Sequence, residues 1–194
     1  MKNNQPMAAP PVFLIGIMAS GKSTLGQALS ERLPDYTFVD LDSLVETEAG
    51  MTVSEIFGHH GQEHFRSLES DALRRVARQG NAIVACGGGT PCRTENMNLM
   101  LEAGTVVWLT APTDVIVRRL QLAPAQQRPL VTAAHGDADA LAALVERLVL
   151  ERSEAYGRAH LQFDSSRLES RSEIDTSVEQ FINLLNNFRN AKVQ

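Results

Sequence analysis

The feature that most constrains this chain is a glycine-rich segment at residues 16–23, which reads GIMASGKS. It matches the pattern G-x-x-x-x-G-K-[ST] and lies between a short apolar run at 12–15 and a helical apolar pattern at 23–33. In that context, backbone N–H groups converge on phosphate oxygens, and the positive end of the following helix points at the same anion. The segment therefore predicts a strand, a phosphate-binding loop and a helix. The alternative is a glycine-rich turn with an incidental lysine.

Lysine usage strengthens the phosphate interpretation. Only three of the 18 basic residues are lysines, at positions 2, 22 and 192. Lys22 is the only lysine outside the terminal segments, so it alone offers an ammonium group to the β- and γ-phosphates of a nucleotide. The neighbouring Ser23 hydroxyl is placed to ligate Mg²⁺.

Strand and helix patterns alternate along the rest of the chain, which predicts an α/β fold with a parallel sheet covered by helices on both faces. We expect strands at 12–15, 36–41, 81–86, 105–109 and 161–163. We expect helices at 23–33, 62–79, 94–103, 113–122, 138–156 and 174–188, with short helices over 43–58 broken by Gly50 and Gly58. Residues 1–11 read as a loose tail, and residues 123–137 read as a mobile loop.

Composition excludes several classes of protein. A chain of 194 residues is long enough for one domain without disulfide bonds, and its two cysteines are too few for a disulfide framework or a structural zinc site. A net charge of −5 argues against a nonspecific nucleic-acid or anionic-membrane binder. No apolar run reaches the ~18 residues of a membrane span. The first residues lack the apolar region of a secretory signal, so a cytoplasmic protein is expected.

Two aspartates follow the apolar run of the second expected strand. Asp40 and Asp42 flank Leu41, and at a strand period of two they would point to the same side, roughly 6.5–7 Å apart. Parallel sheets bind ligands at the carboxyl ends of their strands. One carboxylate can then hold Mg²⁺ through water while the other orients a substrate hydroxyl for attack. The alternative is a cap at the strand end.

Three consecutive glycines, Gly87, Gly88 and Gly89, close the third expected strand. Such a run is costly in chain entropy, and it suits a place where the backbone approaches a ligand closely. A plain flexible turn is the alternative.

Three arginines stand out as possible anion ligands. Arg66 has Glu69 at i+3, where the carboxylate can orient the guanidinium; Arg128 lies in the expected mobile loop; Arg152 lies near the end of the long helix. Guanidinium groups bind carboxylates and phosphates bidentately, and an arginine in a closing loop suits phosphoryl transfer. Surface ion pairs are the alternative for each. His59, His60 and His64 are interpreted as polar residues at a helix start rather than a metal site.

Six segments now form a recognisable set. They are GIMASGKST at 16–24, FVDLD at 38–42, GQEHFRSLE at 61–69, CGGGTPC at 86–92, QRPL at 127–130 and ERSEAY at 151–156. In order and spacing this set resembles the shikimate kinase family over most of residues 12–163. The aspartate pair, the Phe-Arg dipeptide and the triple glycine together are far more specific than the phosphate loop alone.

The resemblance implies ATP-dependent phosphorylation of the 3-hydroxyl of shikimate, on the route to chorismate and aromatic amino acids, with Mg²⁺ as cofactor. It implies a three-layer αβα fold like that of nucleoside-monophosphate kinases, with a five-stranded parallel sheet. Residues 12–190 would form one domain, with a small helical substrate-binding segment at 43–80 and a mobile lid at 120–136. It further implies a monomer whose partner is shikimate rather than a nucleic acid or a membrane.

The resemblance also implies roles for individual residues. ATP would be bound by Ala19, Ser20, Gly21, Lys22, Ser23, Thr24, Arg119 and Arg128. Shikimate would be bound by Asp42, Arg66, Gly87, Gly88, Gly89 and Arg152. Lys22, Asp42 and Arg128 would be catalytic, with Asp42 holding the acceptor hydroxyl and serving as base. Mg²⁺ would be held by Ser23 and, through water, by Asp40.

Two departures from the family pattern concern the nucleotide side. Ala19 stands where the family usually has a second glycine, and we expect tolerance with a slightly altered backbone. Ser165, Ser166 and Arg167 do not match the segment that contacts adenine in the family. A gluconate-kinase-like enzyme is an alternative of the same class. A non-catalytic nucleotide-binding module is the alternative from another class, although the chain has no guanine-reading Asn-Lys-x-Asp and keeps Lys22 and both aspartates.

Overall fold

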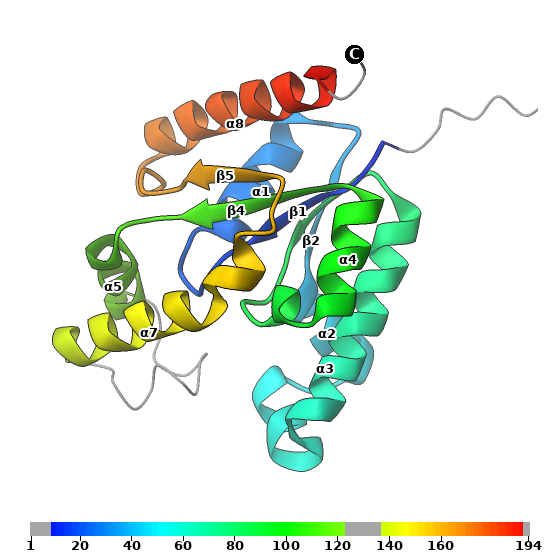
Figure 1. Ribbon diagram of the computed structural model, residues 1–194, viewed down its shortest axis with the longest axis vertical. Helices are drawn as coiled ribbons and strands as arrows, with labels where there is room; N and C mark the ends of the chain where they lie inside the picture. The colour runs from blue at the N-terminus through cyan, green and yellow to red at the C-terminus, as the bar shows by residue number, and fades with distance from the viewer. Residues whose placement is uncertain (1–8, 123–136, 192–194) are drawn as a thin grey trace, which may run out of the picture.

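The computed structural model describes residues 9–122 and 137–191, and Figure 1 shows its elements around one sheet. The strands are β1 (Val12–Ile15), β2 (Thr37–Asp40), β3 (Ala82–Ala85), β4 (Thr105–Thr110) and β5 (Leu161–Asp164). The α-helices are α1 (Lys22–Arg32), α2 (Leu41–Ala49), α3 (Val53–Gln79), α4 (Thr94–Ala103), α5 (Thr113–Leu122), α7 (Ala138–Tyr156) and α8 (Arg171–Ala191). A 3₁₀ turn, η1 (Thr90–Cys92), follows the triple glycine.

The five strands form a parallel sheet in the order β2-β3-β1-β4-β5. Helices cover both faces, because the strands alternate their side chains between two separate apolar cores. In β1, Phe13 and Ile15 enter the core beneath α2, α3, α4, α5 and α7, whereas Val12 and Leu14 enter the core beneath α1 and α8. The expected three-layer architecture is confirmed. The strand ends that carry functional loops therefore meet at one edge of the sheet.

The end of β2 differs from the expectation. The strand ends at Asp40, and Leu41 already begins α2, so Asp42 lies in the first turn of a helix rather than on a strand. Asp40 is the N-cap of that helix, and its side chain accepts a hydrogen bond from the Ser43 backbone N–H at 3.3 Å. The two carboxylates are therefore placed by a strand-to-helix junction, and the strand spacing of the pair does not apply.

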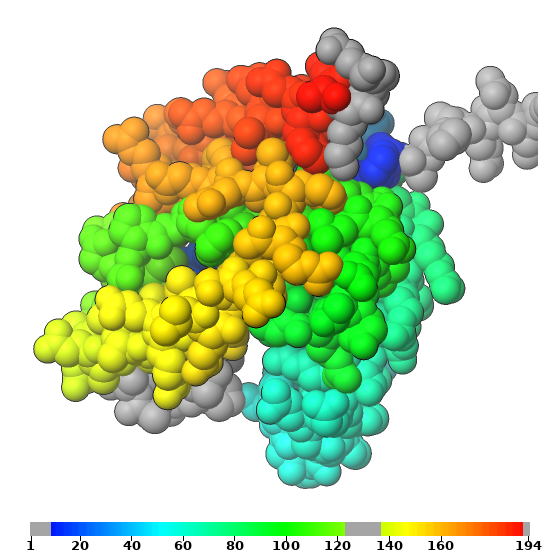
Figure 2. Space-filling model, viewed as in Figure 1, coloured from blue at the N-terminus to red at the C-terminus, as the bar shows by residue number. Residues whose placement is uncertain are grey.

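The helical segment between β2 and β3 also corrects the expectation. Helix α3 begins at a capping box between Thr52 and Glu55, and Gly58 is an ordinary helical residue inside it. The break lies at Gly61, whose φ of 80° is left-handed and separates two helical parts. The part before this break projects away from the sheet, and it forms the cyan lobe of the space-filling view (Figure 2).

Residues 9–11 of the expected tail belong to the folded body, and residues 1–8 lie outside the described residues. The Ala9 carbonyl accepts a hydrogen bond from the Asn81 N–H at 2.8 Å, and the Ala9 N–H donates to the Asn81 side-chain oxygen. The Pro11 carbonyl accepts from the Thr105 N–H at 2.9 Å. The expected lid at 120–136 falls mostly outside the described residues. Within the described ranges, no helix is both long enough and apolar enough to cross a membrane.

We predict that Gly58→Ala and Gly61→Ala change stability in opposite directions. A Cβ at either position meets nothing within 4 Å, so only backbone conformation separates the two variants. Alanine inside a helix should raise the free energy of unfolding by about 0.5–1 kcal/mol, whereas alanine at a left-handed φ should lower it by about 1–2 kcal/mol. Urea unfolding of both variants measures this. Shifts of the same sign would contradict the placement of the break at Gly61.

Candidate active site

The phosphate loop connects β1 to α1, and its shape comes from three residues with positive φ. These are Gly16 at 143°, Ala19 at 57° and Gly21 at 88°. Glycine adopts such angles readily, but a residue with a Cβ does so at a cost of about 1–2 kcal/mol. Ala19 therefore holds a left-handed conformation that a glycine would adopt at lower cost, which places local strain in the loop.

Lys22 is the first residue of α1, and its ammonium group folds back over the loop. Its Nζ donates to the carbonyl oxygens of Ile17 at 2.7 Å and Gly16 at 3.0 Å. Lys22 is the sole lysine in the described ranges 9–122 and 137–191. The positive charge is thus held at the loop where a phosphate group would enter.

Ser23 and Asp40 form a pair beside the loop. The Ser23 hydroxyl donates to Asp40 Oδ2 at 2.7 Å. A hydroxyl and a carboxylate are the donors that hold Mg²⁺ in phosphate-loop enzymes, so this pair fits the ion by its chemistry. Within the described parts of the chain, no group of three or more His, Cys, Asp or Glu residues is placed to hold a metal. An ion at this site would therefore take its remaining ligands from phosphate and water.

The glycine loop Gly87–Gly89 is packed against charged side chains. A Cβ on Gly87 would lie 2.9 Å from Asp42 Oδ1 and 2.7 Å from Glu69 Oε1. A Cβ on Gly88 would lie 2.6 Å from Arg152 Nη1, and one on Gly89 would collide with the Arg66 guanidinium. None of the three glycines has a positive φ. Glycine is required at these three positions because the charged side chains fill the space that a Cβ would occupy. A plain flexible turn would not need glycine for this reason.

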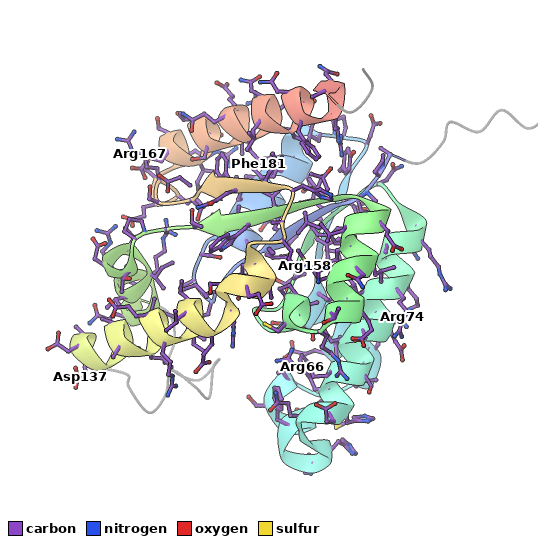
Figure 3. The ribbon with its side chains drawn as sticks, in the orientation of Figure 1. Arg66, Arg74, Asp137, Arg158, Arg167 and Phe181 are labelled. Carbon is purple, nitrogen blue, oxygen red and sulfur yellow. The ribbon has the colours of Figure 1, made fainter. Side chains whose placement is uncertain are left out.

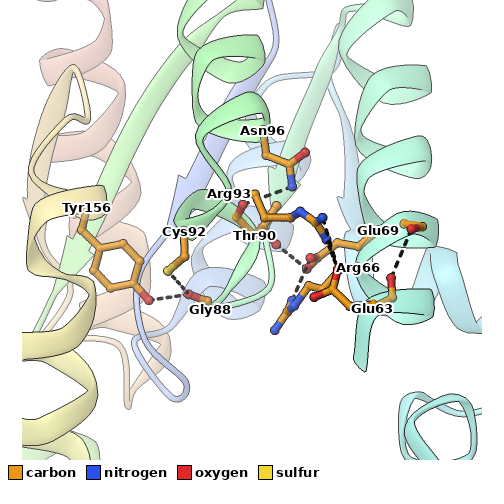
Figure 4. A network of polar contacts seen from close by, with 10 residues as sticks. Glu63, Arg66, Glu69, Gly88, Thr90, Cys92, Arg93, Asn96 and Tyr156 are labelled. Carbon is orange, nitrogen blue, oxygen red and sulfur yellow. Dashed lines mark hydrogen bonds and ion pairs between the residues drawn. The ribbon is translucent and has the colours of Figure 1, made fainter. Parts of the chain in front are cut away.

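A buried ion pair fixes one of those side chains, as Figure 4 shows. Glu69 is 0% exposed, and its Oε2 accepts from Arg66 Nη1 at 2.7 Å, as the i+3 spacing predicted. Its other oxygen accepts from the Thr90 hydroxyl, and Asn96 Nδ2 donates to the Thr90 carbonyl at 3.2 Å. The buried Glu69 carboxylate orients the Arg66 guanidinium, while the Arg66 side chain remains 18% exposed to solvent.

These loops surround a cavity of about 370 Å³. It joins the phosphate loop, both aspartates and the glycine loop in one space. Among the residues proposed from the sequence, those that line it are Ala19, Gly21, Lys22, Ser23, Thr24, Asp40, Asp42, Gly87, Gly88 and Arg119.

Four of the proposed residues do not line the cavity. Ser20 is buried, and Gly89, Arg66 and Arg152 lie against or within the glycine loop rather than on the cavity wall. Arg128 lies outside the described residues.

Arg119 links the phosphate loop to the segment that follows β5. Its guanidinium donates to the carbonyl oxygens of Ser165 at 2.9 Å, Ser166 at 3.0 Å and Ala19 at 3.3 Å. Its partial burial lowers the pKa of Arg119 below the ordinary value. The guanidinium thus ties the strained Ala19 peptide to the segment after β5.

Sequence reasoning missed two residues of that segment. Ser165 is fully buried, and its hydroxyl donates to the carbonyl oxygens of Ser20 at 2.7 Å and Thr110 at 3.0 Å. Leu168 lines the cavity and lies where a Cβ on Gly21 would stand. Their position directly after β5, at the carboxyl end of a parallel strand, is the one signal that could have marked them.

Comparisons with known proteins agree with this geometry. Residues 18–185 match the sequence model of the shikimate kinase family. The chain is 38% identical over 175 residues to the shikimate kinase of Bacteroides fragilis, which covers 90% of this chain and 96% of that one. The chain belongs to the shikimate kinase family.

Solved structures agree with this family assignment. The crystal structure of the shikimate kinase of Bacteroides thetaiotaomicron matches 91% of this chain and 98% of its own, with a TM-score of 0.85 and 36% identity. A shikimate kinase from Acinetobacter baumannii, solved in complex with shikimate, covers 92% of this chain and 94% of its own, with a TM-score of 0.77 and 26% identity. A gluconokinase from Sinorhizobium meliloti covers 94% of this chain and 97% of its own, with a TM-score of 0.52 and 16% identity. The gluconokinase likeness reflects the shared fold alone.

We predict that Ser165→Ala weakens ATP binding selectively. Losing the hydroxyl leaves the Ser20 carbonyl without this donor, so the phosphate loop loses a brace and stability should fall by about 1 kcal/mol. The KM for ATP should rise about threefold to tenfold, and the KM for the second substrate should stay unchanged. The matched control is Ser30→Ala, because Ser30 donates to the Gln27 carbonyl within α1. Equal effects of the two variants on the KM for ATP would contradict the brace.

Proposed function

We propose that this protein transfers the γ-phosphoryl group of ATP to the 3-hydroxyl of shikimate. The observation that carries the proposal is that one cavity joins the phosphate-loop lysine to Asp42 and to the glycine loop. A site of this kind seats a nucleotide tail and a small acceptor side by side. The family to which the chain belongs supports the same activity.

On the nucleotide side, we propose that Lys22 neutralises the β- and γ-phosphates while the loop amides and the start of α1 cradle them. Ser23 and Asp40 would hold Mg²⁺, with Asp40 acting through water. When bound, the ion would neutralise negative charge on the phosphate groups. Arg119 would lie against the nucleotide from the opposite wall, which its place on the cavity lining supports.

On the acceptor side, the first turn of α2 would supply Asp42, the segment of residues 43–80 would supply Arg66, and α7 would supply Arg152. Shikimate is a small carboxylate, and two guanidinium groups beside a glycine loop suit such an anion because they bind carboxylates bidentately. Within one domain of residues 12–190, the two sides would face each other across the cavity. A cytoplasmic monomer stays the expectation.

The transfer itself needs positioning more than covalent chemistry. The acceptor hydroxyl oxygen forms a bond to the γ-phosphorus, its proton passes to the Asp42 carboxylate, and the bond to the β-phosphate oxygen breaks with its electron pair leaving on ADP. Residues 120–136, with Arg128, would close over the site and exclude water that would otherwise hydrolyse ATP.

A coupled assay of ADP release tests the proposed activity. It offers ATP and Mg²⁺ with shikimate, with gluconate, or with no acceptor. Rapid ADP release with shikimate alone supports the proposal. Preference for gluconate would identify a sugar-acid kinase, and no release with either acceptor would indicate a non-catalytic nucleotide-binding module.

We predict that Asp42→Asn lowers kcat by about 10²- to 10⁴-fold, because the amide cannot accept the hydroxyl proton. The substitution keeps the size of the side chain beside Gly87, so the fold should be retained. Calorimetric titration with ATP should give an affinity close to that of the unaltered protein. Turnover near the unaltered rate would remove Asp42 from the chemistry.

We predict that Arg66→Lys raises the KM for shikimate at least tenfold, because an ammonium group keeps the charge but loses the two-pronged contact with a carboxylate. Lysine is preferable to alanine here, since a neutral residue would leave the buried Glu69 carboxylate unpaired and destabilise the protein. Arg74→Lys is the control: Arg74 pairs with Asp71 on the outer side of α3, whereas Arg66 faces the rest of the molecule (Figure 3). An unchanged KM in Arg66→Lys would contradict the role of Arg66.

A further inference from the structure

Tyr156 ends α7 beside the glycine loop, and neither the phosphate loop nor the acceptor ligands proposed above include it. The side chain is 0% exposed, and its ring packs on Trp108 with 5.7 Å between ring centroids. Its hydroxyl donates to the Gly88 carbonyl at 2.7 Å, a contact visible in Figure 4. The two partners are 68 residues apart in the chain.

We propose that Tyr156 is a positioning residue for the acceptor site: its hydroxyl holds the glycine loop and, through the loop, the Arg152 guanidinium that packs against Gly88. The inference rests on the proposed function, because it concerns how that site is held for shikimate. It assigns Tyr156 no contact with the substrate and no part in the proton transfer.

The first group that Tyr156 positions is the peptide between Gly88 and Gly89. A trans peptide is planar, so its C=O and N–H point in opposite directions. By holding the Gly88 oxygen toward α7, the tyrosine turns the Gly89 N–H away from α7. The hydroxyl therefore sets the orientation of the peptide that follows Gly88, a residue of the cavity lining.

The second group is the side chain of Arg152, which lies one helical turn before Tyr156 on the same face of α7. Its guanidinium lies against the same glycine that the tyrosine hydroxyl contacts. A Cβ on Gly88 would lie 2.6 Å from Arg152 Nη1 and 3.6 Å from the Tyr156 hydroxyl, so both groups converge on the same glycine. A shift of the glycine loop would therefore also change the space that the Arg152 guanidinium occupies.

The hydroxyl remains a donor at every pH at which the enzyme would work. Burial raises the pKa of Tyr156 to about 12, even though the Arg152 guanidinium acts in the opposite direction. The buried ring, held by Trp108, leaves the hydroxyl little freedom to turn elsewhere. The hydroxyl can therefore donate to the Gly88 carbonyl throughout the neutral pH range.

The variant Tyr156→Phe removes the hydroxyl and keeps the ring. We expect the KM for shikimate and its calorimetric Kd to rise about fivefold to twentyfold, the range that one lost hydrogen bond of this kind gives. The KM for ATP should change less than twofold, and kcat at saturating shikimate should be largely retained. A residue that only stabilised the fold would lower the melting temperature without separating the two KM values.

Tyr36→Phe is the matched control, because Tyr36 is the only other tyrosine in the chain and is also buried. Its hydroxyl donates to the Pro10 carbonyl at 3.2 Å, among residues that contribute nothing to the cavity lining. We expect Tyr36→Phe to leave both KM values unchanged. If Tyr156→Phe and Tyr36→Phe have the same shikimate KM, the inference is overturned.

A double-mutant cycle with Arg152→Lys provides a second readout. If Tyr156 acts through Arg152, the losses of shikimate affinity in Tyr156→Phe and Arg152→Lys should sum to more than the loss in the double variant. If the two losses of affinity are strictly additive, Tyr156 acts on the Gly88 carbonyl without affecting Arg152, which would contradict the proposed link between the two residues. Failure of the unaltered protein to phosphorylate shikimate would overturn the proposed function, whereas a normal shikimate KM in Tyr156→Phe beside an active unaltered protein would overturn this inference alone.

Discussion

A carboxylate with no access to water must be neutralised where it lies, and Glu69 imposes that requirement on this fold. The side chain accepts hydrogen bonds from Arg66 on its own helix and from Thr90 on η1. One buried charge therefore fixes α3 against the segment after β3. The Arg66 guanidinium leaves this pair oriented but still partly exposed, and the glycine loop lies against it.

The nucleotide side and the acceptor side are built by the same means. In each, a loop at the carboxyl end of a strand is held from behind by buried hydroxyl groups that bond to its carbonyl oxygens. Ser165 holds the phosphate loop at Ser20, and Tyr156 holds the glycine loop at Gly88. Because these carbonyl groups accept hydrogen bonds from the protein interior, the loops can point amide groups toward the cavity that lies between them.

Local patterns in the sequence predicted most of the fold. The helices at 94–103, 113–122 and 138–156 have the bounds that their periodicity indicated, and the phosphate loop follows β1 as its motif required. Other features depend on partners that local patterns do not show. Gly58 and Gly61 look alike in sequence, but only Gly61 is left-handed. The hydroxyl of Ser165 reaches a carbonyl 145 residues away, and no local pattern specifies such a contact.

The crowding around Gly87–Gly89 has a consequence for inhibitor design. A side chain at any of these three positions would displace a charged group that the protein itself places there. A compound that binds against the backbone of these glycines would therefore be difficult to evade by mutation. A substitution at one of the three positions that blocked the compound would also disturb the active site.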